Sequence, residues 1–454
     1  MAKMQSINPA TEEVMNEYEC LTTGQATEEL EKSRKAWEKW KKTPVKKRVE
    51  PLKKLAGLMK AHSRKYGEIM SKEMGKPIKQ AIAEAEKCAW ACEYYAENAK
   101  KFLKDRKIKT EASKSFVAFQ PLGVILGIMP WNFPFWQVFR FAVPAITAGN
   151  VAVLKHSSNV PQCAIEIEKV FREAGYPEYV FKTLLITGSQ TQELIDGDSV
   201  DGISLTGSTE AGKKVGEAAG KNIKKLVLEL GGSDPFVVLP DADMQFACEA
   251  AATARFQNSG QSCIAAKRFI VHKDIAEEFK KKFVEFTRAQ KTGDPMDENT
   301  NIGPLARNDL RDALEDQLKC ALEQGAKLMT GGRKPEGRGY FFEPTIIEVP
   351  KDAPILQEET FGPLAAVIVC ENEKEMIEIA NSTQYGLGAS VWSRDVKKAE
   401  KIARQIDAGF VAINGMVKSD PRLPFGGIKK SGVGRELSEF GIREFVNIKT
   451  IVMQ

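Results

Sequence analysis

The chain has 454 residues, of which 43% are hydrophobic and 28% are charged, and its formal net charge is +5. This length suits two or three domains of about 150 residues each. The small net charge, from 66 basic and 61 acidic residues, argues against a dedicated nucleic-acid binder. A modest positive balance can, however, help to draw in an anionic substrate.

Neither a membrane span nor a secretion signal is predicted. The N-terminus lacks the apolar segment of a signal peptide, and no apolar run approaches the length of about 18 residues that suggests a membrane span. The eight cysteines show no regular framework, which indicates reduced thiols in a cytoplasmic protein. Cys88 and Cys92 have i,i+4 spacing, but no further ligand lies near them in the sequence, so we expect no metal site.

The first half of the chain predicts a helical segment followed by a parallel sheet. Residues 26–105 have apolar residues at helical spacing and dense charge of mixed sign, which predicts helices with solvated faces. From residue 116 onward, short apolar strands alternate with helices, and this alternation predicts a dinucleotide-type parallel sheet covered on both faces. The expected strands are 124–129, 151–154, 183–186, 202–205 and 225–230, and the helices between them are 134–147, 161–174, 191–196 and 209–219.

A second α/β unit is expected after Gly231. Two segments, 107–119 and 444–453, fit neither unit well. The second unit's expected strands are 236–239, 269–272, 365–369 and 389–392, and its helices are 242–258, 275–290, 308–324, 373–381 and 396–406.

Three short motifs supply the parts needed for acyl chemistry at an aldehyde carbon. Cys263 ends the stretch Phe-Gln-Asn-Ser-Gly-Gln-Ser-Cys and could provide a thiolate nucleophile. Glu229 closes an apolar strand before a glycine pair, where partial burial would raise its pKa and suit a general base. Asn132 lies between Pro130 and Pro134, and its side-chain amide could stabilise an oxyanion.

With these motifs in this order, the chain resembles the NAD(P)-dependent aldehyde dehydrogenase superfamily from about residue 6 to the C-terminus. The resemblance implies an α/β fold with a Rossmann-like parallel-sheet cofactor domain, a second α/β catalytic domain and a small oligomerisation sheet, in a homodimer or homotetramer. The expected cofactor domain comprises residues 1–106 and 122–231, and the catalytic domain 232–430. The expected oligomerisation segments are 107–121 and 431–454.

The cofactor residues are also expected from this resemblance. Residues 206–212 follow a strand and open a helix, so that backbone N–H groups could approach a pyrophosphate. The neutral Ser158 and the cationic Lys155 would accept a 2′-phosphate without repulsion, which predicts NADP as the preferred cofactor, with NAD possible. The residues implied to contact the dinucleotide are Trp131, Lys155, Ser158, Gly207, Ser208, Glu359 and Phe361.

Arg140 and Ser419 predict the substrate class. An Arg that projects into an aldehyde tunnel needs an anionic partner, and a substrate carboxylate would satisfy it, with Ser419 as a second donor. This pattern is most similar to the succinate-semialdehyde dehydrogenases, which implies oxidation of succinate semialdehyde to succinate. Two departures are Gln257, where some relatives have a second Arg, and Phe141, where some have a Lys. Alternatively, Arg140 pairs with an acid of the protein itself.

Other functions stay open at this point. The chain could oxidise another short-chain aliphatic or amino aldehyde, with Arg140 in a structural role. A CoA-acylating enzyme is disfavoured by Glu229, because such enzymes generally lack this residue. A non-catalytic member of the family is disfavoured because Cys263, Glu229 and Asn132 are all present.

Overall fold

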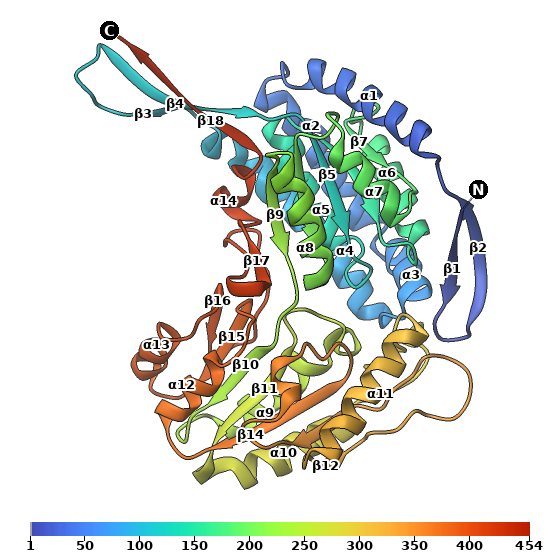
Figure 1. Ribbon diagram of the computed structural model, residues 1–454, viewed down its shortest axis with the longest axis vertical. Helices are drawn as coiled ribbons and strands as arrows, with labels where there is room; N and C mark the ends of the chain where they lie inside the picture. Colours follow the sequence, from blue (N-terminus) through green and yellow to red (C-terminus); the bar gives the residue numbers. More distant parts are fainter. Residues whose placement is uncertain (1) are drawn as a thin grey trace.

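The computed structural model describes residues 2–454, and it confirms the α/β class with parallel sheets. Figure 1 shows two sheet-containing domains, one above the other, and an arm that extends from the upper one. None of the helices in residues 2–454 combines the length and the apolar character needed to cross a membrane.

The first domain is built on a six-stranded sheet with the order β17-β9-β8-β5-β6-β7. Five of these strands run parallel, and β17 pairs antiparallel with the end of β9. The bounds are β5 Val124–Met129, β6 Val151–His156, β7 Phe181–Thr183, β8 Gly202–Thr206, β9 Lys225–Glu229 and β17 Gly432–Val433.

Helices and an N-terminal hairpin complete this domain (Figure 1). Every residue of α5 is buried, as expected for a helix that is apolar on all sides. The helices are α1 Thr23–Trp40, α2 Val45–Ala61, α3 Ser63–Met74, α4 Ile78–Phe102, α5 Trp136–Ala148, α6 Pro161–Glu173, α7 Gly188–Asp196 and α8 Thr209–Lys221, and the hairpin is β1 Lys3–Asn8 with β2 Glu13–Glu19.

The second domain contains a seven-stranded sheet with the order β12-β13-β14-β11-β10-β15-β16. Only the edge strand β12 is antiparallel to its neighbour. The strands are β10 Asp234–Val238, β11 Ala266–His272, β12 Lys327–Thr330, β13 Thr345–Glu348, β14 Leu364–Cys370, β15 Gly388–Trp392 and β16 Phe410–Ile413.

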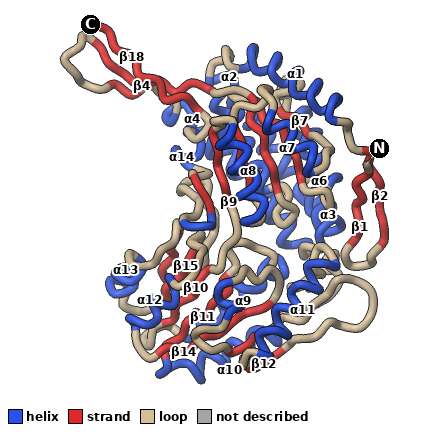
Figure 2. Tube along the Cα trace, in the orientation of Figure 1, coloured by secondary structure: helices blue, strands red, loops and turns tan. Residues whose placement is uncertain are grey.

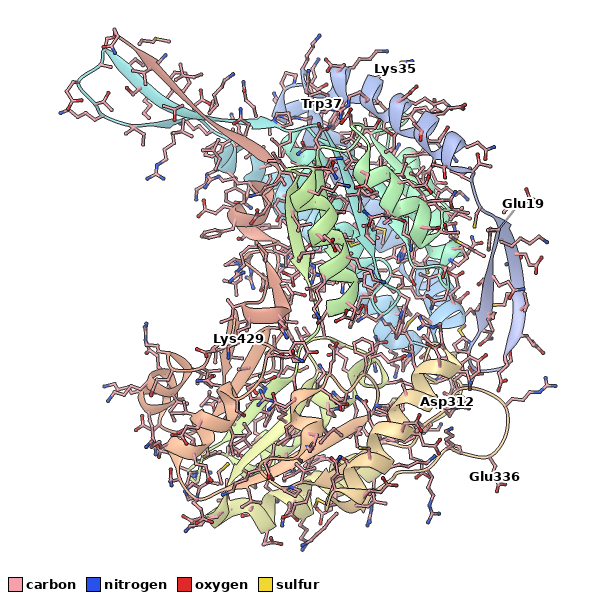
Figure 3. All side chains as sticks on the ribbon, in the orientation of Figure 1. Glu19, Lys35, Trp37, Asp312, Glu336 and Lys429 are labelled. Carbon is pink, nitrogen blue, oxygen red and sulfur yellow. The ribbon has the colours of Figure 1, made fainter. Side chains whose placement is uncertain are left out.

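The helices that follow β10 in the chain include several short 3₁₀ helices, and the last α-helix, α14, packs against the first domain. The α-helices are α9 Met244–Phe256, α10 Ala276–Arg288, α11 Asn308–Glu323, α12 Glu373–Asn381, α13 Val396–Ala403 and α14 Ser438–Ile442, and the 3₁₀ helices are η1 Gln257–Gly260, η2 Lys273–Ile275, η3 Pro354–Gln357 and η4 Lys429–Ser431. Lys429, labelled in Figure 3, marks where the chain returns from the second sheet towards the first.

The projecting arm is a three-stranded sheet with the order β18-β4-β3 (Figure 2). It comprises β3 Arg106–Lys107, β4 Lys114–Pro121 and β18 Val446–Met453. Of the expected segment 431–454, only β18 belongs to this sheet, because β17 pairs with β9 and α14 packs against α4 and α5. The arm's role in oligomerisation stays a prediction.

Candidate active site

The side chains of the candidate site gather where the parallel strands of the first sheet end. Asn132 follows β5, Lys155 is the penultimate residue of β6, and Glu229 is the final residue of β9. The carboxyl ends of parallel strands meet at one edge of a sheet, which is the usual ligand-binding edge in open α/β folds. Cys263 reaches the same place from the loop between η1 and β11 in the second domain.

The loop that carries Cys263 is held in an unusual conformation. Asn258 and Ser259 both have φ values of 55°, in the left-handed region that non-glycine residues seldom adopt. The side-chain amide of Asn258 donates to the carbonyl oxygens of Asn132 at 2.8 Å and Gln261 at 3.0 Å. These bonds join the Asn132 and Cys263 loops, and strain of this kind persists where the surrounding structure over-determines it.

Asn132 is buried and its amide is partly free. Its Nδ2 donates to the carbonyl oxygen of Gln261 at 3.1 Å, two residues before Cys263. An amide nitrogen carries two hydrogens, so this bond leaves one for a ligand. The Oδ1 atom accepts no hydrogen bond from residues 2–454. The amide is therefore placed to donate to an oxygen near Cys263.

Glu229 is a buried carboxylate without hydrogen-bond donors. Its side chain is 2% exposed, and neither of its oxygens has a partner in the described part of the chain. Burial raises the pKa of Glu229 well above its usual value, Arg140 opposes this rise, and the charge of Glu436 adds to it. A carboxyl with a raised pKa and free oxygens can accept a proton from water.

Cys263 is partly exposed, and its thiol is strongly desolvated. Burial raises its pKa to about 12, while the positive charges of Arg140 and Lys267 act in the opposite direction. Lys267 donates through Nζ to the carbonyl oxygens of Ser262 at 3.1 Å, Cys263 at 2.8 Å and Ala265 at 3.2 Å. Lys267 thus fixes the backbone around the thiol, a role that the sequence analysis did not assign.

A cavity of about 420 Å³ lies beside Cys263 and between the two domains. Phe361 and Trp131 meet edge to face in its wall, with ring centroids 5.6 Å apart. Glu359 is fixed by the backbone N–H of Gly232, which donates to its Oε1 at 2.9 Å. The predicted site residues that line this cavity are Trp131, Asn132, Lys155, Gly207, Ser208, Cys263, Glu359 and Phe361.

The residues at one end of this cavity fit a phosphate-bearing dinucleotide. Ser208 caps α8 by accepting from the backbone N–H of Ala211 at 3.2 Å, so the positive end of this helix faces the cavity next to Gly207. Lys155 makes no ion pair with any of residues 2–454, although burial lowers its pKa. A desolvated ammonium without a protein carboxylate suits an anionic or polyhydroxyl ligand.

Ser158 differs from the other predicted cofactor residues in its position. It is exposed and borders a shallow depression beside Lys3 and Glu17 of the N-terminal hairpin, whereas its neighbour Ser157 lines the main cavity. The hairpin was not expected from the sequence. The contact between Ser158 and a cofactor stays a prediction.

Arg140 is paired within the protein. It forms a buried ion pair with Glu436 through Nε, donates to Thr206 Oγ1 at 3.3 Å and stacks over Phe425 at 4.9 Å. This is the alternative in which Arg140 pairs with an acid of the chain. A direct contact between Arg140 and a substrate carboxylate stays a prediction.

Ser419 lies near Lys87, which belongs to the helical segment whose charges were expected to face solvent. Lys87, on α4, donates to Ser419 Oγ at 2.8 Å, and Trp136 Nε1 donates to the same oxygen at 3.0 Å. The prediction that these charges face solvent holds only in part at this position, because Lys87 is partly exposed while its ammonium is desolvated. It is wrong for Lys76 and Glu84, which form a fully buried ion pair.

These features define a cofactor-binding α/β protein with a partly exposed cysteine and an amide donor in the wall of one cavity and a buried carboxylate close to the cysteine. The chain belongs to the aldehyde dehydrogenase family, whose sequence profile matches residues 1–451. It is therefore an oxidoreductase that acts on an aldehyde.

Several similar proteins are named for the oxidation of succinate semialdehyde. The chain is 47% identical to a probable succinate-semialdehyde dehydrogenase [NADP(+)] from Synechocystis sp., over 98% of both chains. It is 45% identical to succinate-semialdehyde dehydrogenase [NADP(+)] 1 from Mycobacterium tuberculosis, again over 98% of both. The crystal structure of succinic semialdehyde dehydrogenase from Streptococcus pyogenes in complex with NADP+ superimposes with a TM-score of 0.97 at 38% identity, covering 99% of both chains.

Proposed function

We propose that this protein oxidises succinate semialdehyde to succinate with NADP as the preferred cofactor. The observation that carries the proposal is that relatives named for this activity align at 45–47% identity over nearly the whole chain. The cationic Lys155 beside a glycine-bearing helix start and the cations near Cys263 agree with an anionic cofactor and an anionic aldehyde.

Cys263 begins the reaction in this proposal. Its thiolate Sγ attacks the aldehyde carbon, and the carbonyl oxygen becomes an oxyanion that the free N–H of Asn132 Nδ2 and the backbone N–H of Cys263 stabilise. NADP, when bound, accepts the hydride that the resulting thiohemiacetal loses. Lys155, Gly207, Ser208, Glu359 and Phe361 would hold it in the cavity, with Trp131 as a backbone contact.

Glu229 completes the turnover by hydrolysis. Its free carboxylate oxygens remove a proton from water, which attacks the thioester carbon; the C–S bond breaks and succinate leaves. The regenerated Cys263 thiolate is stabilised by the positive charges of Arg140 and Lys267, which both favour its ionised form.

We also infer a homodimer or homotetramer that works in the cytoplasm. The arm carries exposed apolar side chains, Ile108, Ile448, Val452 and Met453, on a small sheet that packs little of its surface against its own chain. Exposed apolar surface of this kind indicates burial by another subunit. The eight free cysteines favour a reducing compartment.

The test is the rate of NADPH formation by the purified protein with succinate semialdehyde and with butanal, a neutral aldehyde of equal length. Each is repeated with NAD in place of NADP. We expect a preference for the anionic aldehyde and for NADP, each of tenfold or more in kcat/KM. Equal rates with butanal would contradict the proposal that succinate semialdehyde is the substrate. They would favour an enzyme that oxidises another short-chain aldehyde.

A further inference from the structure

Lys87 is a desolvated cation next to the catalytic residues, and it lacks a carboxylate partner. It lies on α4, its Nζ is 4.3 Å from the centre of the Trp136 ring, and its hydrogen bond goes to the neutral Ser419. Burial, together with the nearby charge of Arg140, lowers its pKa to about 8. Lys87 is only partly exposed, and a desolvated ammonium without an acid partner is costly, so proteins seldom keep one without a use.

The acids around Lys87 are already engaged elsewhere. Glu84 pairs with Lys76 and accepts the backbone N–H groups of Phe135 and Trp136, both at 2.9 Å. Asp420 is held by Arg422 at 2.7 Å. Both carboxylates still act on Lys87 from a distance, but neither pairs with it directly. The ammonium keeps two N–H donors that no residue of the described chain accepts.

The hydroxyl of Ser419 is likewise a free donor. Lys87 Nζ and Trp136 Nε1 are donors only, so Ser419 Oγ accepts from both. Its own hydrogen must therefore point to a third group, and within residues 2–454 no acceptor receives it. Ser419 is 5% exposed, which makes an unused donor there expensive.

Lys87 and Ser419 bring their free donors and a positive charge close together, because Lys87 Nζ and Ser419 Oγ are 2.8 Å apart. Arg140 lies close enough to lower the pKa of Lys87 and to oppose the rise in the pKa of Cys263, so this cluster lies near the thiol. Arg140 itself is engaged by Glu436. An incoming carboxylate would therefore find Lys87, rather than Arg140, without a competing anion.

We propose that Lys87, with the hydroxyl of Ser419, binds the carboxylate of the substrate at the end remote from its aldehyde group. The Trp136 indole keeps both donors in place, because its N–H holds Ser419 and its ring faces the Lys87 ammonium. Lys87 is then a residue that determines specificity for an anionic aldehyde. This inference rests on the proposed function and names the group that recognises its substrate.

The test compares Lys87→Met with wild type, using succinate semialdehyde and butanal. Lys87→Met should raise KM for succinate semialdehyde tenfold or more and change KM for butanal less than twofold. Lys100→Met, at an exposed position of the same helix, is the matched control and should change neither. Lys87→Arg should recover part of the loss, and Ser419→Ala should raise KM for the anionic aldehyde severalfold.

The outcomes separate this inference from the proposed function. If wild type does not prefer succinate semialdehyde, the proposed function fails. If wild type prefers it and Lys87→Met keeps the same preference, the assignment of Lys87 fails.

A measurement on wild type covers the case in which Lys87→Met does not fold. Succinate and butyrate are compared as inhibitors competing with the aldehyde from pH 6.5 to 9.5. Lys87 is charged below about pH 8 and loses its charge above it, so the preference for succinate should fall as the pH rises past 8. Arg140, the paired Glu84 and Asp420, and Cys88, whose thiol pKa is raised well above its usual value, also face Lys87. A preference that stays constant over this range would overturn the assignment.

Discussion

Arg140 and Glu436 form an ion pair that is almost completely buried, with side chains 2% and 5% exposed. The charges of both partners act on the pKa of Glu229, which indicates that the pair lies near that carboxyl. Arg140 also lowers the pKa of Cys263. One buried guanidinium thus favours the ionised forms of the candidate nucleophile and of the candidate base.

Arg140→Met should destabilise the fold strongly. The substitution leaves Glu436 buried without its counter-charge, and breaking a buried pair in this way costs about 3–5 kcal/mol. Urea denaturation followed by circular dichroism measures the change in the free energy of unfolding. Adding Glu436→Gln should recover part of the loss, since no charge then remains unpaired. A single variant as stable as wild type would contradict the pairing.

The sequence was sufficient to predict the strands that form the centre of each sheet. Continuous apolar runs predicted β5, β8, β10, β11 and β14, and each of them is confirmed to within a few residues. The short strands β12, β13 and β16 and the N-terminal hairpin were not predicted. β12, β13 and β16 have four residues each, and strands this short carry too little periodicity to be recognised.

The partners of charged residues at the site were harder to predict than the candidate catalytic motifs. Cys263, Asn132 and Glu229 stand in recognisable local patterns, and the structure brings them to one place. The partner of Arg140 lies far away in the chain, and pattern analysis cannot choose among many acids. Lys87 has the same local context as solvated lysines on α4, and only the packing of Trp136 and Ser419 on that helix distinguishes it.

Alkylation of Cys263 in the free protein should depend steeply on pH. Burial raises the thiol pKa to about 12, so the reactive thiolate fraction should rise about tenfold per pH unit between pH 6.5 and 9.5. The rate of inactivation by iodoacetamide measures it. Cys263→Ala, which should form no NADPH, identifies labelling at the exposed Cys320. An inactivation rate that levels off near pH 7 would show that the neighbouring cations lower the pKa of Cys263 more than burial raises it.

Glu229→Gln should separate hydride transfer from hydrolysis. The amide cannot take a proton from water, so the thioester on Cys263 should accumulate after one round of hydride transfer. Stopped-flow absorbance should show a burst of about one NADPH per active site, followed by a steady rate at least 100-fold below that of wild type.

Glu439→Gln is the matched control, because Glu439 is an exposed acid on α14 that pairs with Arg443 at 3.2 Å. It should keep the steady rate of wild type. A steady rate near that of wild type in Glu229→Gln would remove Glu229 from the role of base. If the burst is lost as well, Glu229 acts before or during hydride transfer.

Ser158→Glu should shift the cofactor preference from NADP towards NAD. A carboxylate at this position would repel a 2′-phosphate, and placing like charges together costs several kcal/mol. The ratio of kcat/KM for NADP to that for NAD should fall by at least tenfold. Ser158 is exposed, so the substitution should not change the free energy of unfolding.

Two further variants identify which side chain faces the phosphate. Ser157→Glu places the same charge one residue earlier, where the side chain lines the main cavity. Lys155→Met removes the cation that lacks a protein partner, and it should weaken NADP binding more than NAD binding. If Ser157→Glu changes the ratio and Ser158→Glu does not, the phosphate lies inside the cavity beside Lys155, and the assignment of Ser158 is wrong.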